Sequence, residues 1–336
     1  MILAGDIGGT HTRIALFNEE GGKLKLVLER VYPSREHKSL DEIVSLFISN
    51  ESVKVKVACF GIAGPVLHGR VSTPNLAWVV DAIQLTKLLG IDAVWVINDL
   101  QAHASGVDDL ETADFILLNK LETAGGNAAL IAAGTGLGEA GLYWDGTRRW
   151  PFPCEGGHCD FAPRNDQEIA LFQYLSKKFG RVSYERVLSG PGLRNIYEFL
   201  HETGAEQQPD WLKDELAHAA DPVAVISQYG IEGKAAICER ALDMFVSIYG
   251  AEAGNLALKM MAVGGIFISG GIAAKIMPKL TGPAFLQAFV SKGRLQPLME
   301  TIPVRVIVNN QVGLIGAARY AVLQASKATA TTIPWG

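Results

Sequence analysis

The sequence predicts an α/β protein built on parallel or mixed sheets. Short apolar and β-branched runs alternate with segments of helical spacing through the N-terminal third, an alternation typical of βαβ units. A strand, a glycine-rich turn and a second strand occur near residue 5 and again near residue 134. With 336 residues, the chain is long enough for two domains of about 150 residues each.

In the N-terminal part, apolar strands and amphipathic helices follow one another. Strands are expected at 1–4, 12–17, 25–31, 53–62 and 93–97, and helices at 40–48 and 82–89. Ser39 directly precedes the first of these helices. Its hydroxyl can accept a hydrogen bond from an unpaired N–H of the first turn, so we expect it to cap the helix.

The pattern starts again after residue 114. Strands are expected at 115–118, 128–133, 139–144, 263–269 and 301–308, and helices at 169–177, 237–249, 255–261 and 314–325. We expect Asp166 to cap the helix at 169–177, and residues 327–336 to form a loose tail. The second half therefore repeats the strand and glycine-turn arrangement of the first.

Composition argues against several classes of function. The chain has 30 Lys and Arg residues against 35 Asp and Glu residues, a formal net charge of −5, and no basic stripe, so we expect no nucleic-acid partner. No apolar run reaches the ~18 residues of a membrane span, and the N-terminus lacks signal-peptide features. We therefore expect a cytoplasmic protein without a membrane partner. Four cysteines do not make a disulfide framework, and we expect them to be reduced.

Three glycine turns follow apolar strands, and none matches a P-loop or a dinucleotide-binding motif. Backbone N–H groups in such turns can approach a phosphate closely, because glycine has no Cβ. The first turn adds Asp6, whose carboxylate could orient a Mg²⁺-bound water, and Thr10, whose hydroxyl could donate to a phosphate. Alternatively, the glycines only make tight hairpins. The candidate phosphate-binding residues are Gly5, Asp6, Gly8, Gly9, Thr10, Gly134, Thr135, Gly136, Gly270 and Gly271.

The strand at 93–97 runs into Asn98 and Asp99. Ligands of open α/β sheets collect outside the carboxyl ends of the strands. An ionised Asp99 could there accept a proton from an attacking hydroxyl, and Asn98 could bind a polyol by donating and accepting hydrogen bonds. The alternative is an Asx turn or a helix N-cap.

Two glycines separate Glu155 from His158, which would let both side chains reach one ligand from a turn. Zinc bound by His158 with Cys154 and Cys159 is an alternative, although two of these ligands are adjacent and no C-x-x-C pair elsewhere in the sequence supports it. A lone loop histidine is commonly only solvated. Glu185 precedes another glycine turn, for which the alternative is a surface helix followed by a loop.

Seven motifs in this order resemble the bacterial ATP-dependent glucokinase family over about residues 3–320. They lie at 5–10, 97–99, 134–138, 155–163, 185–192, 254–258 and 270–272. The resemblance implies the actin-like ATPase fold, in which two α/β domains with ribonuclease-H-like sheets enclose a central cleft. It places the small domain at 1–109 plus 304–336 and the large domain at 110–303.

The resemblance also implies the reaction, phosphorylation of D-glucose at its 6-hydroxyl with ATP and Mg²⁺. Asp99 would be the general base, and the glycine turns would bind ATP, the third turn lying against the adenosine. The residues implied to hold the sugar are Asn98, Asp99, Glu155, His158 and Glu185. The cysteine-rich zinc motif of the related repressor and kinase branch is absent from the sequence, so we expect no bound structural metal. The resemblance further suggests a homodimer.

Two alternatives to glucose phosphorylation follow from the same residues. Small displacements of Glu155 and Asn98 would change which hydroxyls are bound, so the chain could be a kinase of mannose, fructose or an N-acetylhexosamine. A sugar sensor without catalysis on the same fold would need a DNA-binding module, whereas this chain is acidic and its first motif begins at residue 5.

Overall fold

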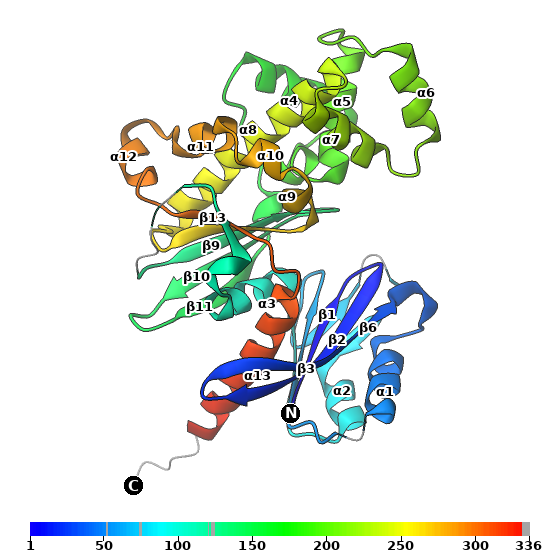
Figure 1. Ribbon diagram of the computed structural model, residues 1–336, viewed down its shortest axis with the longest axis vertical. Coiled ribbons are helices and arrows are strands. Elements are labelled where there is room, and N and C mark those ends of the chain that lie inside the picture. Colours follow the sequence, from blue (N-terminus) through cyan, green and yellow to red (C-terminus); the bar gives the residue numbers. More distant parts are fainter. Residues whose placement is uncertain (52, 74–75, 120, 122–124, 331–336) are drawn as a thin grey trace. The chain divides into compact units, whose positions relative to one another are not determined.

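The computed structural model describes residues 1–51, 53–73, 76–119, 121 and 125–330 (Figure 1). Contacts divide the chain into two compact units. The first comprises Met1–Asp114, Trp150–Pro153 and Asn309–Gly336, and the second comprises Phe115–Arg149 and Cys154–Val308. The division expected from the resemblance falls slightly earlier, after residues 109 and 303.

The first unit is a five-stranded sheet in the order β3-β2-β1-β4-β7, with a separate β5-β6 pair. β2 pairs antiparallel with both β1 and β3, whereas β4 and β7 run parallel to β1. Its elements are β1 (Ile2–Ile7), β2 (His11–Glu20), β3 (Lys23–Pro33), α1 (Leu40–Asn50), β4 (Val57–Ile62), β5 (Arg70–Ser72), β6 (Val79–Asp81), α2 (Ala82–Leu89), β7 (Val94–Asn98), α3 (Asp99–Gly106) and α13 (Val312–Ala330).

Helices cover both faces of this sheet. α1 presents Leu40, Ile43, Val44 and Phe47, all buried, because the spacing i, i+3, i+4, i+7 puts them on one side of a helix. They pack with side chains of α2 and of one sheet face, while α3 and α13 pack on the other face. The Ser39 cap is confirmed, since its side chain accepts from the third helical residue.

The second unit has a six-stranded sheet in the order β11-β10-β9-β12-β13-β8. β9 pairs with β10 antiparallel and with β12 parallel, so the central arrangement of the first unit recurs. The elements are β8 (Phe115–Leu117), β9 (Ala128–Ala133), β10 (Leu137–Trp144), β11 (Arg149–Cys154), α4 (Asp166–Phe179), α5 (Gly190–Glu202), α6 (Asp210–His218), α7 (Pro222–Glu232), α8 (Ala236–Met260), β12 (Gly265–Ser269), α9 (Gly271–Lys275), α10 (Met277–Leu280), α11 (Pro283–Val290), α12 (Gln296–Met299) and β13 (Val304–Ile307).

One helix, α8, replaces the two helices predicted at 237–249 and 255–261. The prediction of two helices was wrong, and the predicted gap between them contains Gly250 and Gly254. In the structure these glycines lie inside the helix, where α11 packs so closely that a Cβ on either would collide with the carbonyl of Phe285 or Phe289. Their role is close packing between two helices.

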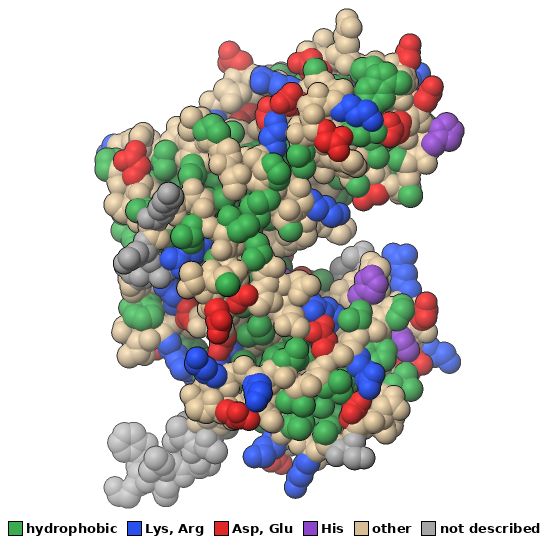
Figure 2. Space-filling view, viewed as in Figure 1, with side chains coloured by type: hydrophobic (Ala, Val, Ile, Leu, Met, Phe, Trp, Pro, Cys, Tyr) green, Lys and Arg blue, Asp and Glu red, His purple; other side chains and the backbone are tan. Residues whose placement is uncertain are grey.

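Several helices and strands begin or end at residues other than those predicted. The N-cap of α4 is Asn165, not Asp166, and β4 begins at Val57, later than the predicted strand at 53–62. α13 continues to Ala330, so residues 327–330 are helical rather than a loose tail; residues 331–336 lie outside the described residues. Within the described residues, no helix combines the length and apolarity needed to cross a bilayer. On the face shown in Figure 2, acidic and basic side chains are interspersed.

Candidate active site

In the first unit, Asn98 and Asp99 lie where β7 ends and α3 begins. The side-chain oxygen of Asn98 accepts from the N–H groups of Leu100 (2.9 Å) and Gln101 (3.3 Å), which makes Asn98 the N-cap of α3. Its amide nitrogen donates to the carbonyl of Gly64 at 3.2 Å. The helix-cap interpretation is therefore correct for Asn98, and the cap fixes the backbone from which Asp99 projects.

The Asp99 carboxyl is a half-buried acid with a perturbed pKa. Burial raises its pKa above the usual 3.8, and the charge of Asp6 contributes in the same direction. The neighbouring His103 and the N–H of Leu100, which donates to Asp99 Oδ1 at 2.9 Å, oppose the rise. A raised pKa makes the carboxylate a better proton acceptor than an exposed aspartate.

The first glycine motif is divided between a strand and a turn. β1 continues past Gly5, and a Cβ at this position would collide with the ring of Phe60. Gly5 is therefore a packing residue of the sheet, and the turn itself consists of residues 8–10. Asp6 is half-buried and faces the start of α13, where a Cβ on Gly313 would lie 3.0 Å from its Oδ2.

In the second unit, Glu185 packs against the glycine hairpin between β9 and β10. The N–H of Leu137 donates to Glu185 Oε2 at 3.1 Å, and a Cβ on Gly136 would lie 2.5 Å from the same oxygen. The Gly134 carbonyl accepts from the N–H of Gly190 at 2.8 Å. The hairpin is thus bonded both to the segment that carries Glu185 and to the start of α5.

Glu155 and His158 lie on and beside a single helical turn, η4 (Gly156–His158). The N–H of His158 donates to the Glu155 carbonyl at 3.0 Å, and both side chains are exposed. A Cβ on Gly157 would collide with the backbone of Leu137. The turn therefore lies directly on the glycine hairpin.

A second short turn, η5 (Tyr184–Arg186), carries Glu185 and is bonded to the first. The N–H of Tyr184 donates to the carbonyl of Cys159, the residue after η4, at 2.9 Å. Three predicted sugar-binding residues, Glu155, His158 and Glu185, are thus held on adjoining turns of the second unit.

The third glycine turn connects a strand to a helix, β12 to α9. Gly270 has φ +90° and a Cβ there would lie 2.7 Å from the Ala133 carbonyl, so glycine is required. Gly271 has open space around it. Next to this turn lies a pocket of about 500 Å³, whose lining includes Gly271 together with Gly134 and Thr135 of the hairpin.

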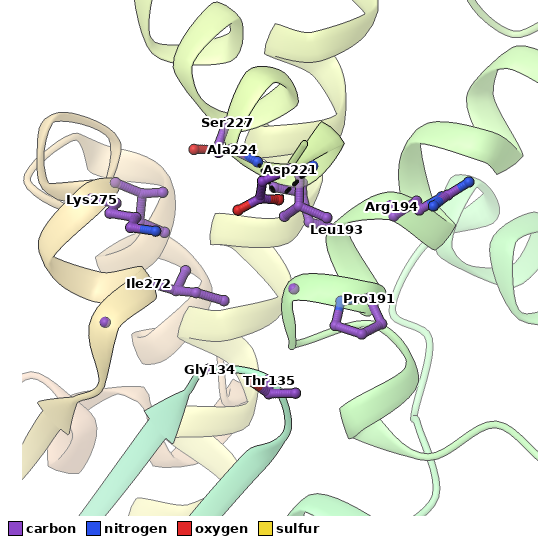
Figure 3. A pocket seen from close by; sticks show the side chains of 14 residues that line it. Gly134, Thr135, Pro191, Leu193, Arg194, Asp221, Ala224, Ser227, Ile272 and Lys275 are labelled. Atoms are coloured by element: carbon purple, nitrogen blue, oxygen red, sulfur yellow. Dashed lines mark hydrogen bonds between the residues drawn. The ribbon is translucent and has the colours of Figure 1, made fainter. Parts of the chain in front are cut away.

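The pocket walls are largely apolar (Figure 3). Pro191 and Leu193 come from α5, and Ile272 comes from α9. Asp221 and Ser227 belong to the start and middle of α7; Asp221 Oδ1 accepts from two N–H groups of the first turn of this helix, both at 3.1 Å. The pattern of the sequence does not reveal these walls, because they come from three separate helices. The available signal was Asp221 followed by proline, which is typical of a helix start.

The turn that carries His158 is flanked by Cys154 and Cys159. Burial is the main cause that raises the pKa of the Cys154 thiol above 9.0. Throughout the part of the chain that the structure describes, no group of three or more His, Cys, Asp or Glu side chains is arranged to hold a metal ion.

Known proteins resemble the chain over nearly its whole length. The family model described as Glucokinase matches residues 3–324. A glucokinase from Nostoc punctiforme is 41% identical over 336 residues, covering 95% of this chain and 98% of that protein. A crystal structure of glucokinase from an Antarctic psychrotroph has a TM-score of 0.85 at 28% identity, covering 96% of this chain and 98% of that one.

A more distant structure shares the fold alone. The ROK family glucokinase from Streptomyces griseus, solved in complex with glucose and AMPPNP, has a TM-score of 0.64 at 18% identity and covers 96% of this chain and 99% of that one. The actin-like ATPase fold expected from the sequence is confirmed by these likenesses. Given the family match over residues 3–324 and a relative 41% identical across almost the whole chain, the chain belongs to the glucokinase family and is a hexose kinase.

Proposed function

We propose that this chain transfers the γ-phosphoryl group of ATP to the 6-hydroxyl of D-glucose. The observation that carries the proposal is the bonded assembly in the second unit. There, Glu185 lies against the glycine hairpin, and the turn with Glu155 and His158 lies on the same hairpin. Sugar-binding side chains next to a phosphate-binding turn are what phosphoryl transfer needs, because catalysis of this reaction is mainly positioning and charge stabilisation.

Asp99 is proposed as the general base. Its backbone is fixed by the Asn98 cap, and burial raises its pKa. It accepts the proton of the 6-hydroxyl as the oxygen attacks the phosphorus atom, a role worth about 10²–10⁴-fold in rate. Turnover should accordingly fall on acidification at a higher pH than for an exposed aspartate, because only the ionised carboxylate can accept the proton.

The other sugar hydroxyls are proposed to bind Asn98, Glu155, His158 and Glu185. A pyranose hydroxyl both donates and accepts hydrogen bonds, and a carboxylate can accept from two adjacent hydroxyls in strong charge-assisted bonds. Asn98 is the most constrained of the four, because its oxygen caps α3 and its nitrogen donates to Gly64. We expect its contribution to the sugar to be smaller than that of Glu155 or His158.

ATP is proposed to bind with its adenosine in the apolar pocket and its phosphates on the glycine turns. The pocket has a volume of about 500 Å³, within the ~300–1,000 Å³ of typical ligand sites. Pro191, Leu193 and Ile272 offer apolar surface for a purine, and Lys275 is a cation at the pocket. The unsubstituted backbone at Gly134 and Gly271 allows close approach of phosphate oxygens.

Mg²⁺ is proposed to bind to the phosphates of ATP, next to the carboxylate of Asp6. A half-buried carboxylate beside the turn at 8–10 fits this ion, which usually keeps several waters and takes one or two carboxylates plus substrate phosphates. When bound, Mg²⁺ would neutralise charge on the phosphates. Asp6 would orient a water ligand. The N–H groups of Gly9 and Thr10 would hold the phosphate oxygens, since the Gly8 N–H donates to the His11 carbonyl at 3.0 Å.

The test is ADP formation from Mg²⁺-ATP without sugar and with glucose, mannose, fructose or N-acetylglucosamine. We expect strong stimulation by glucose and weaker stimulation by the others. Turnover with another hexose in preference to glucose would make the chain a kinase of that sugar. Binding of glucose without any turnover would contradict the proposal in favour of a sugar sensor.

A further inference from the structure

A buried carboxyl that takes no part in the proposed chemistry lies under η4, the turn that carries His158. Glu139 is the third residue of β10 and only 2% exposed. Its carboxyl occupies the space where a side chain on Gly156 would stand, since a Cβ there would lie 2.6 Å from Glu139 Cδ. The backbone of η4, from which Glu155 and His158 project, therefore rests on this carboxyl.

Glu139 meets a second buried acid, Glu252 of α8, which is 0% exposed. Glu252 accepts from Asn255 Nδ2 at 2.8 Å and from Lys259 Nζ at 3.3 Å. Glu139 Oε1, in contrast, has no hydrogen-bond partner among the described atoms. The two carboxyls thus have unequal surroundings, with the donors gathered on Glu252.

The same network continues to the other sugar-binding turn. Asn255 Nδ2 also donates to the hydroxyl of Tyr184, at 2.9 Å, and Asn255 Oδ1 accepts from Lys292 Nζ at 2.6 Å. Tyr184 begins η5, the turn that carries Glu185. One buried polar network therefore supports both η4 and η5 from below.

The protonation of Glu139 follows from its neighbours. Burial is the main cause that raises its pKa, with the charge of Glu252 adding and that of Lys259 opposing, to about 8. Tyr249 of α8 and Cys154 of β11 also face this carboxyl. Near neutral pH Glu139 is therefore protonated, and its hydroxyl can donate to the Glu252 carboxylate.

We propose that Glu139 is a positioning residue for sugar binding: its protonated carboxyl, held between Gly156 and Glu252, keeps η4 in the arrangement that presents Glu155 and His158 to the sugar. The role rests on the proposed function, since it concerns the same sugar site. Above about pH 8, loss of the proton places a second negative charge beside Glu252. The two carboxylates then repel each other, and the turn above them shifts.

The test measures kcat and the KM values for glucose and ATP from about pH 6 to pH 9.5. In the wild type, the glucose KM should rise above about pH 8, with little change in the ATP KM. Glu139→Gln keeps the shape and a donor for Glu252 but cannot ionise, so its glucose KM should lack this rise. Glu139→Ala should raise the glucose KM about tenfold or more at neutral pH, with kcat within about threefold of wild type.

Two control variants separate this role from general effects. Glu168→Gln alters another buried acid of the same unit, 3% exposed and paired with Arg164, and should leave the rise of the glucose KM unchanged. Lys292 also titrates in this range, because burial lowers its pKa to about 8. The rise should persist in Lys292→Met. If the rise of the glucose KM disappeared in Lys292→Met, or persisted in Glu139→Gln, the proposal would be overturned.

Two readouts do not depend on glucose turnover. Amide hydrogen exchange over residues 155–161 should be faster in Glu139→Ala than in the wild type and unchanged in Glu139→Gln at neutral pH. If the wild type showed no glucose-dependent turnover, the proposed function would be refuted. Amide hydrogen exchange would still test whether Glu139 supports η4. Equal exchange in Glu139→Ala and the wild type would refute that support.

The pH dependence of stability gives the second readout. The folded chain keeps the Glu139 proton between 4.5 and about 8, where the unfolded chain loses it, so folding stability falls as pH rises through this window. Glu139→Gln cannot lose stability in this way. The Tm of the variant minus the Tm of the wild type should therefore increase from about pH 5 to about pH 8. A constant Tm difference would contradict the assigned protonation.

Discussion

The two glycine hairpins share their connectivity and differ in what surrounds them. β1 and β2, like β9 and β10, are antiparallel, and each hairpin lies beside a parallel strand. The polar groups beside the first hairpin include the carboxylates of Asp6 and Asp99. The second hairpin contacts Glu185 and borders an apolar pocket. The same glycine hairpin therefore occurs in both units, and the side chains around each hairpin determine what that hairpin can bind.

The largest expected effect comes from removing the base of the first unit. Asp99→Asn keeps the size and the hydrogen bond to the Leu100 N–H but cannot take a proton, so kcat should fall by about 10²–10⁴-fold. Initial rates at saturating glucose and ATP measure this. Asp92→Asn, an exposed acid of the same unit, is the matched control and should behave as wild type. Turnover of Asp99→Asn close to wild type would remove Asp99 as the base.

The third glycine turn has no hairpin counterpart in the first unit, and it offers a matched pair of variants. Gly270→Ala forces a side chain into left-handed backbone against the Ala133 carbonyl, so it should cost about 1–3 kcal/mol of folding free energy. Gly271→Ala has open space and should be close to neutral. Urea unfolding compares the two, and equal stability would show that the turn is not held as described.

The second hairpin can be altered with little damage to the fold. A Cβ on Gly136 displaces only the end of the Glu185 side chain, whereas a Cβ on Gly134 meets nothing within 4 Å. Gly136→Ala should therefore raise the glucose KM about tenfold, equivalent to about 1.4 kcal/mol, while Gly134→Ala leaves it unchanged. If both variants gave the same glucose KM, the contact between Glu185 and the hairpin would have no role in sugar binding.

The smallest effect is expected away from both hairpins, at the start of α1. Ser39→Ala removes the side-chain oxygen that accepts from the Glu42 N–H at 3.2 Å, which should cost about 1 kcal/mol of stability. The kinetic constants should not change. A loss of activity in this variant would mean that the first unit is coupled to the site more widely than its local contacts indicate.

The sequence predicted best where one physical signal acts alone. The apolar spacing of α1 and the capping Ser39 gave that helix its correct start, and the glycine hairpins were identified in both halves. Prediction failed where distant contacts override local signals. Gly250 and Gly254 resemble helix breakers in sequence, yet in the structure they admit the backbone of α11. Gly5 was predicted as part of a glycine turn, yet it lies inside β1, where it makes room for the Phe60 ring.

The candidate site was predicted only where its residues have a local signal in the sequence. Glu155, His158 and Glu185 stood out because each lies beside glycines, and the structure holds them on adjoining turns. Glu139 was not identified, because a single glutamate in a strand has no local signal. Only the packing of η4 on β10 shows that its carboxyl lies under the turn. The homodimer stays a prediction, and sedimentation at micromolar concentration would test it.

Calorimetric glucose binding to Asp99→Asn and to His158→Ala tests the division of roles most directly. We expect Asp99→Asn to bind glucose about as tightly as the wild type, because catalysis and not binding depends on its charge. His158→Ala should weaken binding by at least about tenfold, since it removes a hydrogen-bonding partner of the sugar. Loss of binding in Asp99→Asn with binding intact in His158→Ala would contradict the account.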